Sequence, residues 1–158
     1  MMTRYEAFAG AISSIHRCIQ KIERDEMIRY GYKGSFAQYL TAMTHYPDGI
    51  TAAQLCEVCD RDKAAVSRAI AEMEEKQLIC RSSLHGYRAL LLLTEQGKSA
   101  ADFVFSRAQA ATQAVGKDLS DEQRRIFYAA LASIATNLDQ VSAAGLPLTS
   151  FTKEDTHE

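Results

Sequence analysis

One four-residue pattern, Ser or Thr followed three positions later by Glu or Gln, occurs four times in this chain. The matches begin at Thr3, Ser35, Thr51 and Ser120, and each precedes a segment with helical spacing of apolar residues. In such a capping box, the hydroxyl accepts a hydrogen bond from the backbone amide three residues on, and the Glu or Gln side chain reaches back to the first amide. The four matches therefore predict four helix N-termini and a mainly α-helical chain.

Apolar residues at alternating steps of four and three positions mark the long helices. They predict helices over about residues 4–30, 95–115 and 121–143. The first stripe comprises Phe8, Ile12, Ile15, Ile19 and Ile22, and the last comprises Phe127, Leu131, Ile134, Leu138 and Val141. Stripes this narrow are typical of helices that pair with other helices. We therefore expect a two-fold homodimer that buries Ile12, Ile15, Ile19, Leu131, Ile134 and Leu138 in or near its shared core.

The middle of the chain predicts shorter elements. A helix is expected over residues 36–46, and two more follow Thr51 and Asp62, with Leu55 and Val58 turned inward. The segments "ICRSS" and "YRALLLLT" predict two strands around an "LHG" tip. Six helices and a short β-hairpin wing in this order predict a winged helix-turn-helix in one domain, 3–144, with a DNA-binding core at about 35–94 and dimerisation helices at 3–30 and 95–144. The polar segment 145–158 is expected to be a disordered tail.

Composition and motifs argue against several classes of function. A formal net charge of −2 argues against a protein that coats nucleic acid non-specifically, although a local basic surface is compatible with it. No apolar run approaches the ~20 residues needed to span a membrane and no secretory pattern occurs, so we expect a cytoplasmic protein with no membrane partner. The histidines are scattered, and neither Gly-x-Ser-x-Gly nor a phosphate-binding glycine loop occurs. We therefore do not expect an enzyme.

The segment "DRDKAAVSRAIAEMEEKQLI", residues 60–79, separates its charges along one helix. Basic, small and hydroxylated residues come first, and Glu72, Glu74 and Glu75 follow. A helix N-terminus carries partial positive charge and free amides, which favour phosphate. In a helix-turn-helix, this end of the second helix enters the major groove. The candidate DNA-binding residues are Arg61, Lys63, Ala64, Ser67 and Arg68.

These side chains suit a helix that is inserted by its basic end. Lys63 and Arg68 can reach phosphates, Arg68 can also read a guanine edge, and Ala64 and Ser67 are small enough for close approach. The alternative is an ordinary solvated surface on which Arg68 pairs with Glu72, worth a few tenths of a kcal/mol at most. The short preceding helix and the hairpin that follows favour DNA binding.

The segments "AAQLCEVCDRDKAAVSRAIAEMEEKQLICRSS" and "YRALLLLTEQGK" resemble the multiple-antibiotic-resistance regulator (MarR) family of bacterial winged-helix repressors. The most specific parts are "VSR", "EMEEKQLI" and "LTEQGK", and the resemblance covers about residues 3–144. It implies a dimer whose first and last helices pair across a two-fold axis, and it places Ser67 and Arg68 at the family's groove-facing pair. The family's wing usually carries Asp-x-Arg, with the Arg in the minor groove. Here "SSLHGYRA" has no Asp, and Arg88 is the nearest candidate.

The resemblance also implies a pocket for a small aromatic effector, where the paired helices meet the DNA-binding core. The candidate pocket residues are His16, Tyr39, Met43 and Tyr46, and plain core packing is the alternative for each of them.

The chain has four cysteines, Cys18, Cys56, Cys59 and Cys80, which we expect to be reduced. Cys56 and Cys59 could form a redox pair or half a zinc site, but a tetrahedral site needs four ligands, and no second Cys-x-x-Cys or His-x-x-x-His occurs. A buried free Cys packs like a small hydrophobe. We therefore expect both to pack, with no metal and no cofactor, and Cys18 is a candidate peroxide-sensing thiol.

These observations predict a sequence-specific transcriptional regulator, a homodimer that binds double-stranded DNA at a pseudo-palindromic operator. We expect a repressor that a small-molecule effector releases. Two alternatives stay open: a winged-helix interaction module without DNA binding, and a thiol-based redox sensor on the same fold.

Overall fold

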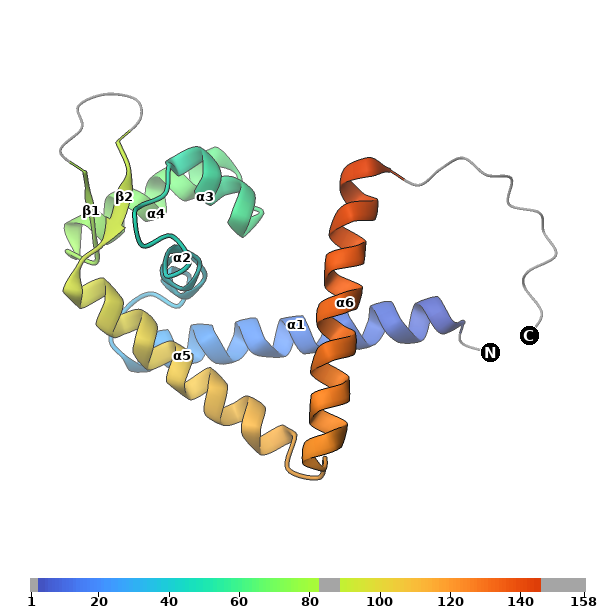
Figure 1. Cartoon of the computed structure of the whole chain (residues 1–158). Helices are drawn as coiled ribbons and strands as arrows, with labels where there is room; N and C mark the ends of the chain where they lie inside the picture. The colour runs from blue at the N-terminus through green and yellow to red at the C-terminus, as the bar shows by residue number, and fades with distance from the viewer. Residues whose placement is uncertain (1–2, 83–88, 146–158) are drawn as a thin grey trace. The chain divides into compact units, whose positions relative to one another are not determined.

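The computed structural model describes residues 3–82 and 89–145. Within them the chain forms six helices and one two-stranded antiparallel sheet (Figure 1). The elements are α1 (Arg4–Arg29), α2 (Phe36–Met43), α3 (Ala52–Cys59), α4 (Lys63–Glu75), β1 (Ile79–Arg81), β2 (Leu91–Leu93), α5 (Glu95–Val115) and α6 (Asp121–Ala144). This order confirms the predicted winged helix-turn-helix. Contacts divide the chain into two compact units, Met1–Gln113 and Ala114–Glu158.

Three of the four predicted capping boxes are present. The hydroxyls of Thr3, Thr51 and Ser120 accept from the backbone amide three residues on at 3.1, 3.2 and 3.2 Å, and each Glu or Gln side chain accepts from the first amide. These bonds satisfy amides that have no partner inside the helix. The starts of α1, α3 and α6 therefore follow directly from the local sequence.

The fourth predicted capping box, at Ser35, is wrong. Ser35 has helical backbone angles, φ −63° and ψ −18°, and its hydroxyl makes no capping bond. A tight turn begins α2 instead, because the amides of Phe36 and Ala37 donate to the carbonyls of Lys33 and Gly34 at 2.9 and 3.2 Å. Gln38, the expected return partner, accepts from Arg61 at 3.2 Å. A contact between distant segments has therefore replaced the local one.

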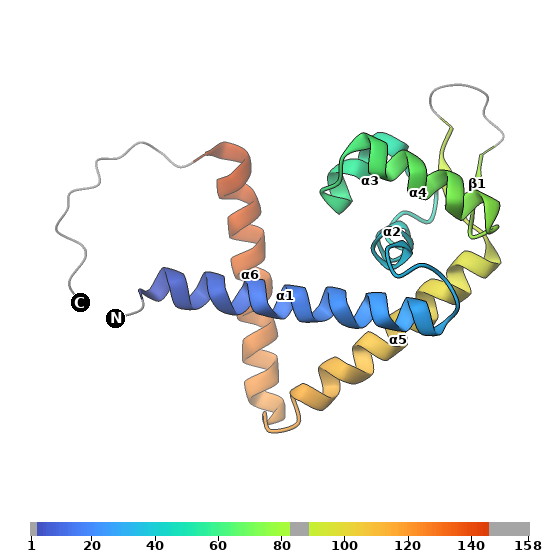
Figure 2. The same ribbon diagram turned by 180° about the vertical axis from the view of Figure 1, so that it is seen from behind.

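Helix α2 lies at the centre of the first unit, between α1 and the pair α3 and α4 (Figures 1 and 2). Its Phe36, Leu40 and Met43 are buried, and they join one apolar core with residues of every other element of this unit. The helix ends three residues earlier than expected, since His45 and Tyr46 close tight turns ahead of Pro47.

Helix α3 buries Leu55, as expected, but leaves Val58 half exposed, at 49%. The expectation that Val58 turns inward is therefore wrong. Cys56 and Cys59 pack partly against the core in its place. The inward face of α3 thus runs through Leu55 and the two cysteines, and Val58 lies to its side.

The base of the wing is a short two-stranded sheet, and a residue outside its strands, Ile50, also pairs with it. Strands β1 and β2 pair antiparallel, with Ile79 opposite Leu93 and Arg81 opposite Leu91. Ile50, just before α3, exchanges two backbone hydrogen bonds with Leu91, at 3.0 and 2.8 Å. The sheet is therefore fastened to the segment that leads into the helix-turn-helix. The predicted "LHG" tip lies outside the described residues.

The junction between β2 and α5 is unusually close-packed. The Thr94 hydroxyl accepts from the Gly97 amide at 3.0 Å and thus caps α5, and it also lies 2.6 Å from the Gln77 carbonyl, to which it can donate. A Cβ atom on Gly97 would lie 1.9 Å from the Leu78 carbonyl oxygen. Only glycine therefore lets the first turn of α5 rest on this backbone.

The predicted apolar stripes of α1 and α6 are largely exposed in the single chain. On α1, Ile12, Ile15 and Ile19 are exposed by 40, 51 and 40%, and on α6, Ile134 and Leu138 by 39 and 52%. Each stripe offers apolar surface for a partner, as a dimer requires, and the dimer stays a prediction. No helix among the described residues is long and apolar enough to cross a membrane.

Candidate nucleic-acid interface

The turn between α3 and α4 is short and closed by backbone bonds. Asp60 adopts the left-handed conformation, with φ 48° and ψ 55°. The amides of Asp60 and Arg61 donate to the carbonyls of Glu57 and Cys56, at 3.2 and 3.0 Å, which is the usual way to close a helix C-terminus. The Asp62 carboxylate then accepts from the Ala65 amide at 2.8 Å and begins α4, as predicted. The two helices are thus joined as in a helix-turn-helix.

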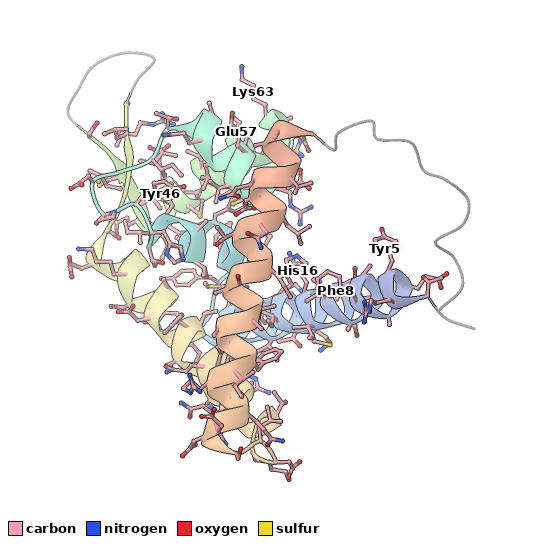
Figure 3. All side chains as sticks on the ribbon, turned by 45° about the vertical axis from the view of Figure 1, so that its right-hand side comes forward. Tyr5, Phe8, His16, Tyr46, Glu57 and Lys63 are labelled. Carbon is pink, nitrogen blue, oxygen red and sulfur yellow. The ribbon has the colours of Figure 1, made fainter. Side chains whose placement is uncertain are left out.

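One face of α4 is fixed in the core, which orients the other face outward. Val66, Ile70 and Met73 are at most 3% exposed. The face opposite them is exposed over five residues, Lys63, Ala64, Ser67, Arg68 and Ala71. Figure 3 shows the Lys63 side chain extending away from the rest of the unit. Four of the six predicted DNA-binding residues therefore share the outer face of α4.

Two of the three glutamates at the acidic end of α4, Glu72 and Glu74, are paired within the fold. Glu72 pairs with Lys33, from the loop before α2, and Glu74 pairs with Arg81 of β1 through two hydrogen bonds, at 2.8 and 3.2 Å. The alternative pair of Arg68 with Glu72 is not formed, and Arg68 has no ion pair among the described residues. The outer face of α4 thus keeps its positive charges unpaired at its N-terminal half.

Arg61 occupies a different place from the other candidates. Its Nε donates to the Gln38 side chain on α2, and it lines a cavity of about 350 Å³ with residues of α1. Arg88 lies outside the described residues. Arg61 was predicted with the α4 residues because it is adjacent to them in sequence, and its bond to α2 depends on the tertiary fold.

The candidate effector residues are dispersed. Tyr39 and Met43 are 3 and 2% exposed in the core, and burial raises the pKa of the Tyr39 phenol. His16 is exposed on α1, and Figure 3 shows it well apart from Tyr46. The 350 Å³ cavity and a second one, of about 550 Å³ beside Tyr32 and Phe36, are lined by other residues. The effector pocket at the four predicted residues stays a prediction.

Cys56 and Cys59 have the surroundings of packing residues. Both are partly buried against the core, and burial raises the pKa of the Cys59 thiol despite the opposing effect of Arg61. A raised thiol pKa lowers the fraction of reactive thiolate. No cluster of three metal-binding side chains occurs among the described residues.

The double substitution Cys56→Ser/Cys59→Ser is therefore expected to leave the response to oxidant unchanged. Operator affinity, measured by fluorescence anisotropy before and after peroxide treatment, should change equally in this variant and in the parent. A large response in the parent that disappears in the variant would establish Cys56 and Cys59 as a redox pair.

The comparisons with known proteins agree with this geometry. The sequence model of the MarR family matches residues 30–86, which span α2, α3, α4 and β1. Over this range the chain is similar to the MarR family. No curated protein sequence matches the chain.

Solved structures of MarR-family regulators share its fold. A regulator from Silicibacter pomeroyi matches with a TM-score of 0.70 at 17% identity, over 86% of this chain and 92% of that one. A regulator from Listeria monocytogenes, complexed with 26mer DNA, matches with a TM-score of 0.69 at 19% identity, over 90% of this chain and 97% of that one. The oxidised form of MarR from E. coli matches with a TM-score of 0.66 at 16% identity, over 80% of this chain and 92% of that one. The likeness extends beyond the winged helix to most of the chain.

Proposed function

We propose that this protein is a sequence-specific, dimeric DNA-binding transcriptional regulator, a repressor that a small molecule releases from its operator. The observation that carries the proposal is the exposed, unpaired basic end of α4. At its acidic end, Glu72 pairs with Lys33 and Glu74 with Arg81, so these two carboxylates are engaged away from the surface that DNA would meet. The regulator from Listeria monocytogenes, which has this fold, is complexed with DNA.

The physical argument concerns the first two turns of α4. Lys63, Ser67 and Arg68 lie near the helix N-terminus, where the helix dipole adds to their attraction for phosphate. Ala64 and Ser67 leave room for the helix to enter a major groove, about 12 Å wide. Arg68 can then reach the O6 and N7 atoms of a guanine. Arg61, bonded to Gln38, is expected to contribute less.

A two-fold dimer sets the form of the operator. Two copies of α4 related by the axis would enter successive major grooves, so the half-sites should lie about 10 bp apart in a pseudo-palindrome. The exposed stripes of α1 and α6 are the surfaces that would form such a dimer.

The substitution Arg68→Ala tests the proposal directly. If Arg68 reads a guanine, the free energy of operator binding should weaken by about 1–3 kcal/mol. The preference for guanine over the other bases should then be lost at one position in each half-site. If Arg68 contacts only phosphate, binding should weaken by the same factor for every DNA sequence. The slope of the logarithm of the binding constant against the logarithm of salt concentration should fall in magnitude by about one unit per lost contact. Arg88→Ala should show the second pattern at most. Anisotropy titrations on the palindrome upstream of the gene, at several salt concentrations, separate these outcomes.

The matched control is Arg125→Ala, which removes an exposed arginine of α6 that is paired with Glu122. This variant should bind the operator like the parent. If a folded, dimeric Arg68→Ala protein also binds like the parent, the basic end of α4 is ordinary surface, and the chain is better described as an interaction module on a winged-helix fold.

A further inference from the structure

One stripe of exposed residues runs along the whole outer face of α4. It comprises Ala64, Arg68, Ala71 and Glu75, which are separated by four, three and four positions. Side chains at this spacing share one side of a helix. Arg68 lies in the first half of this outer stripe, and Glu75 is the last residue of the helix. At a rise of about 1.5 Å per residue, the two opposite charges are about 10 Å apart along the helix axis.

Glu75 differs from the two other glutamates at this end of α4. Glu72 pairs with Lys33, and Glu74 pairs with Arg81. Glu75 forms no ion pair in the described part of the chain, and Lys33, which lines the same cavity of about 550 Å³, is engaged by Glu72. The fold therefore compensates two of the three negative charges and leaves the one on the outer stripe uncompensated.

The outer stripe can meet DNA in two orientations. When α4 is inserted by its N-terminal end, Arg68 enters the major groove and Glu75 stays outside it. When the 13-residue helix, about 20 Å long, lies along the groove, Glu75 also comes between the two rows of phosphates. The groove is about 12 Å wide, so a carboxylate inside it is within about one Debye length of phosphates on both sides. Repulsion therefore disfavours the second orientation.

We propose that Glu75 is a specificity-determining residue, whose carboxylate weakens non-specific DNA binding more than operator binding. Attraction between basic side chains and phosphates supplies nearly all of the free energy of non-specific binding, and it does not select one orientation of the helix. On the operator, base contacts near Arg68 fix the insertion by the N-terminal end, so Glu75 stays outside the groove. This role of Glu75 rests on the proposed function, because it requires that α4 binds DNA by its N-terminal end.

The substitution Glu75→Gln removes the charge and keeps the length of the side chain. Fluorescence anisotropy measures binding of the full-length protein to the operator upstream of the gene and to a scrambled duplex of equal length and composition. Affinity for the scrambled duplex should rise about fivefold or more, since each protomer of the dimer loses one repelling carboxylate, and the gain should shrink at high salt. Affinity for the operator should rise less than about twofold. The ratio of operator affinity to non-specific affinity should therefore fall by more than about twofold.

Two further variants control this experiment, and thermal melting checks that each variant is folded. Glu75→Asp keeps the negative charge and should bind both duplexes like the parent. Asp102→Asn removes an exposed carboxylate of α5 that has no ion pair among the described residues, so it changes the net charge equally and should leave both affinities unchanged. No gain in Glu75→Gln, an equal gain on both duplexes, or the same gain in Asp102→Asn would each overturn the role of Glu75. If the parent binds neither duplex, the proposed function fails, and the role of Glu75 fails with it.

Discussion

The double substitution Ile12→Glu/Ile19→Glu is expected to convert the protein from a dimer into a monomer. Both side chains lie on the apolar stripe of α1 and are 40% exposed in the single chain, so a partner helix is required to cover them. Placing an unpaired carboxylate in such an interface costs several kcal/mol. Because each protomer would contribute two, the dimer dissociation constant should rise by about a thousandfold or more. Light scattering at micromolar concentration measures the mass.

The control for this prediction is Ile28→Glu on the same helix. Ile28 is 57% exposed and does not continue the stripe, so this variant should remain a dimer. If the double variant keeps the dimer mass, the α1 stripe is not the interface. A folded monomer should also lose most of its operator affinity, since it engages one half-site instead of two.

The substitution Gly97→Ala is expected to destabilise the winged helix severely. The new methyl group would lie 1.9 Å from the Leu78 carbonyl oxygen, which is a backbone atom and cannot rotate away. Overpacking that forces the backbone to move costs about 3 kcal/mol or more. The midpoint of urea unfolding, compared at one protein concentration, should fall accordingly.

Gly10→Ala provides the contrasting case. Gly10 lies within α1, and a Cβ atom there has no neighbour within 4 Å. Alanine should therefore raise the unfolding midpoint, since it is favoured over glycine in a helix by up to about 1 kcal/mol. A Gly97→Ala midpoint equal to that of the parent would show that α5 shifts away from Leu78 at little cost.

The parts of the fold that could be predicted from the sequence depend on neighbouring residues. The bonds at Thr3, Thr51 and Ser120 join positions three apart, and the spacing of Val66, Ile70 and Met73 decides which face of α4 is buried. Both are local properties, so a single sequence reveals them. The outer face of α4, with most of the candidate site, followed from the same periodicity.

The parts that were missed depend on contacts between distant segments. Ser35 fails as a cap because its backbone is helical, and Gln38, its expected return partner, is engaged by Arg61, 23 residues later. The 350 Å³ cavity beside Arg61 was also missed, although its lining residues Arg17, Lys21 and Arg24 are spaced by four and three positions and thus share one side of α1. That spacing is the available sequence signal. Its meaning depends on Gly34 and Arg61 arriving at the same place, which only the tertiary structure shows.

The two hydrogen bonds between Ile50 and Leu91 have a dynamic consequence. They join the segment before α3 to the strand that ends the wing, at 3.0 and 2.8 Å, and both residues are at most 1% exposed. Opening either segment alone would leave buried amide and carbonyl groups without partners, which is costly. The base of the wing and the entrance to the helix-turn-helix therefore form one cooperative folding unit, which unfolds and re-forms together.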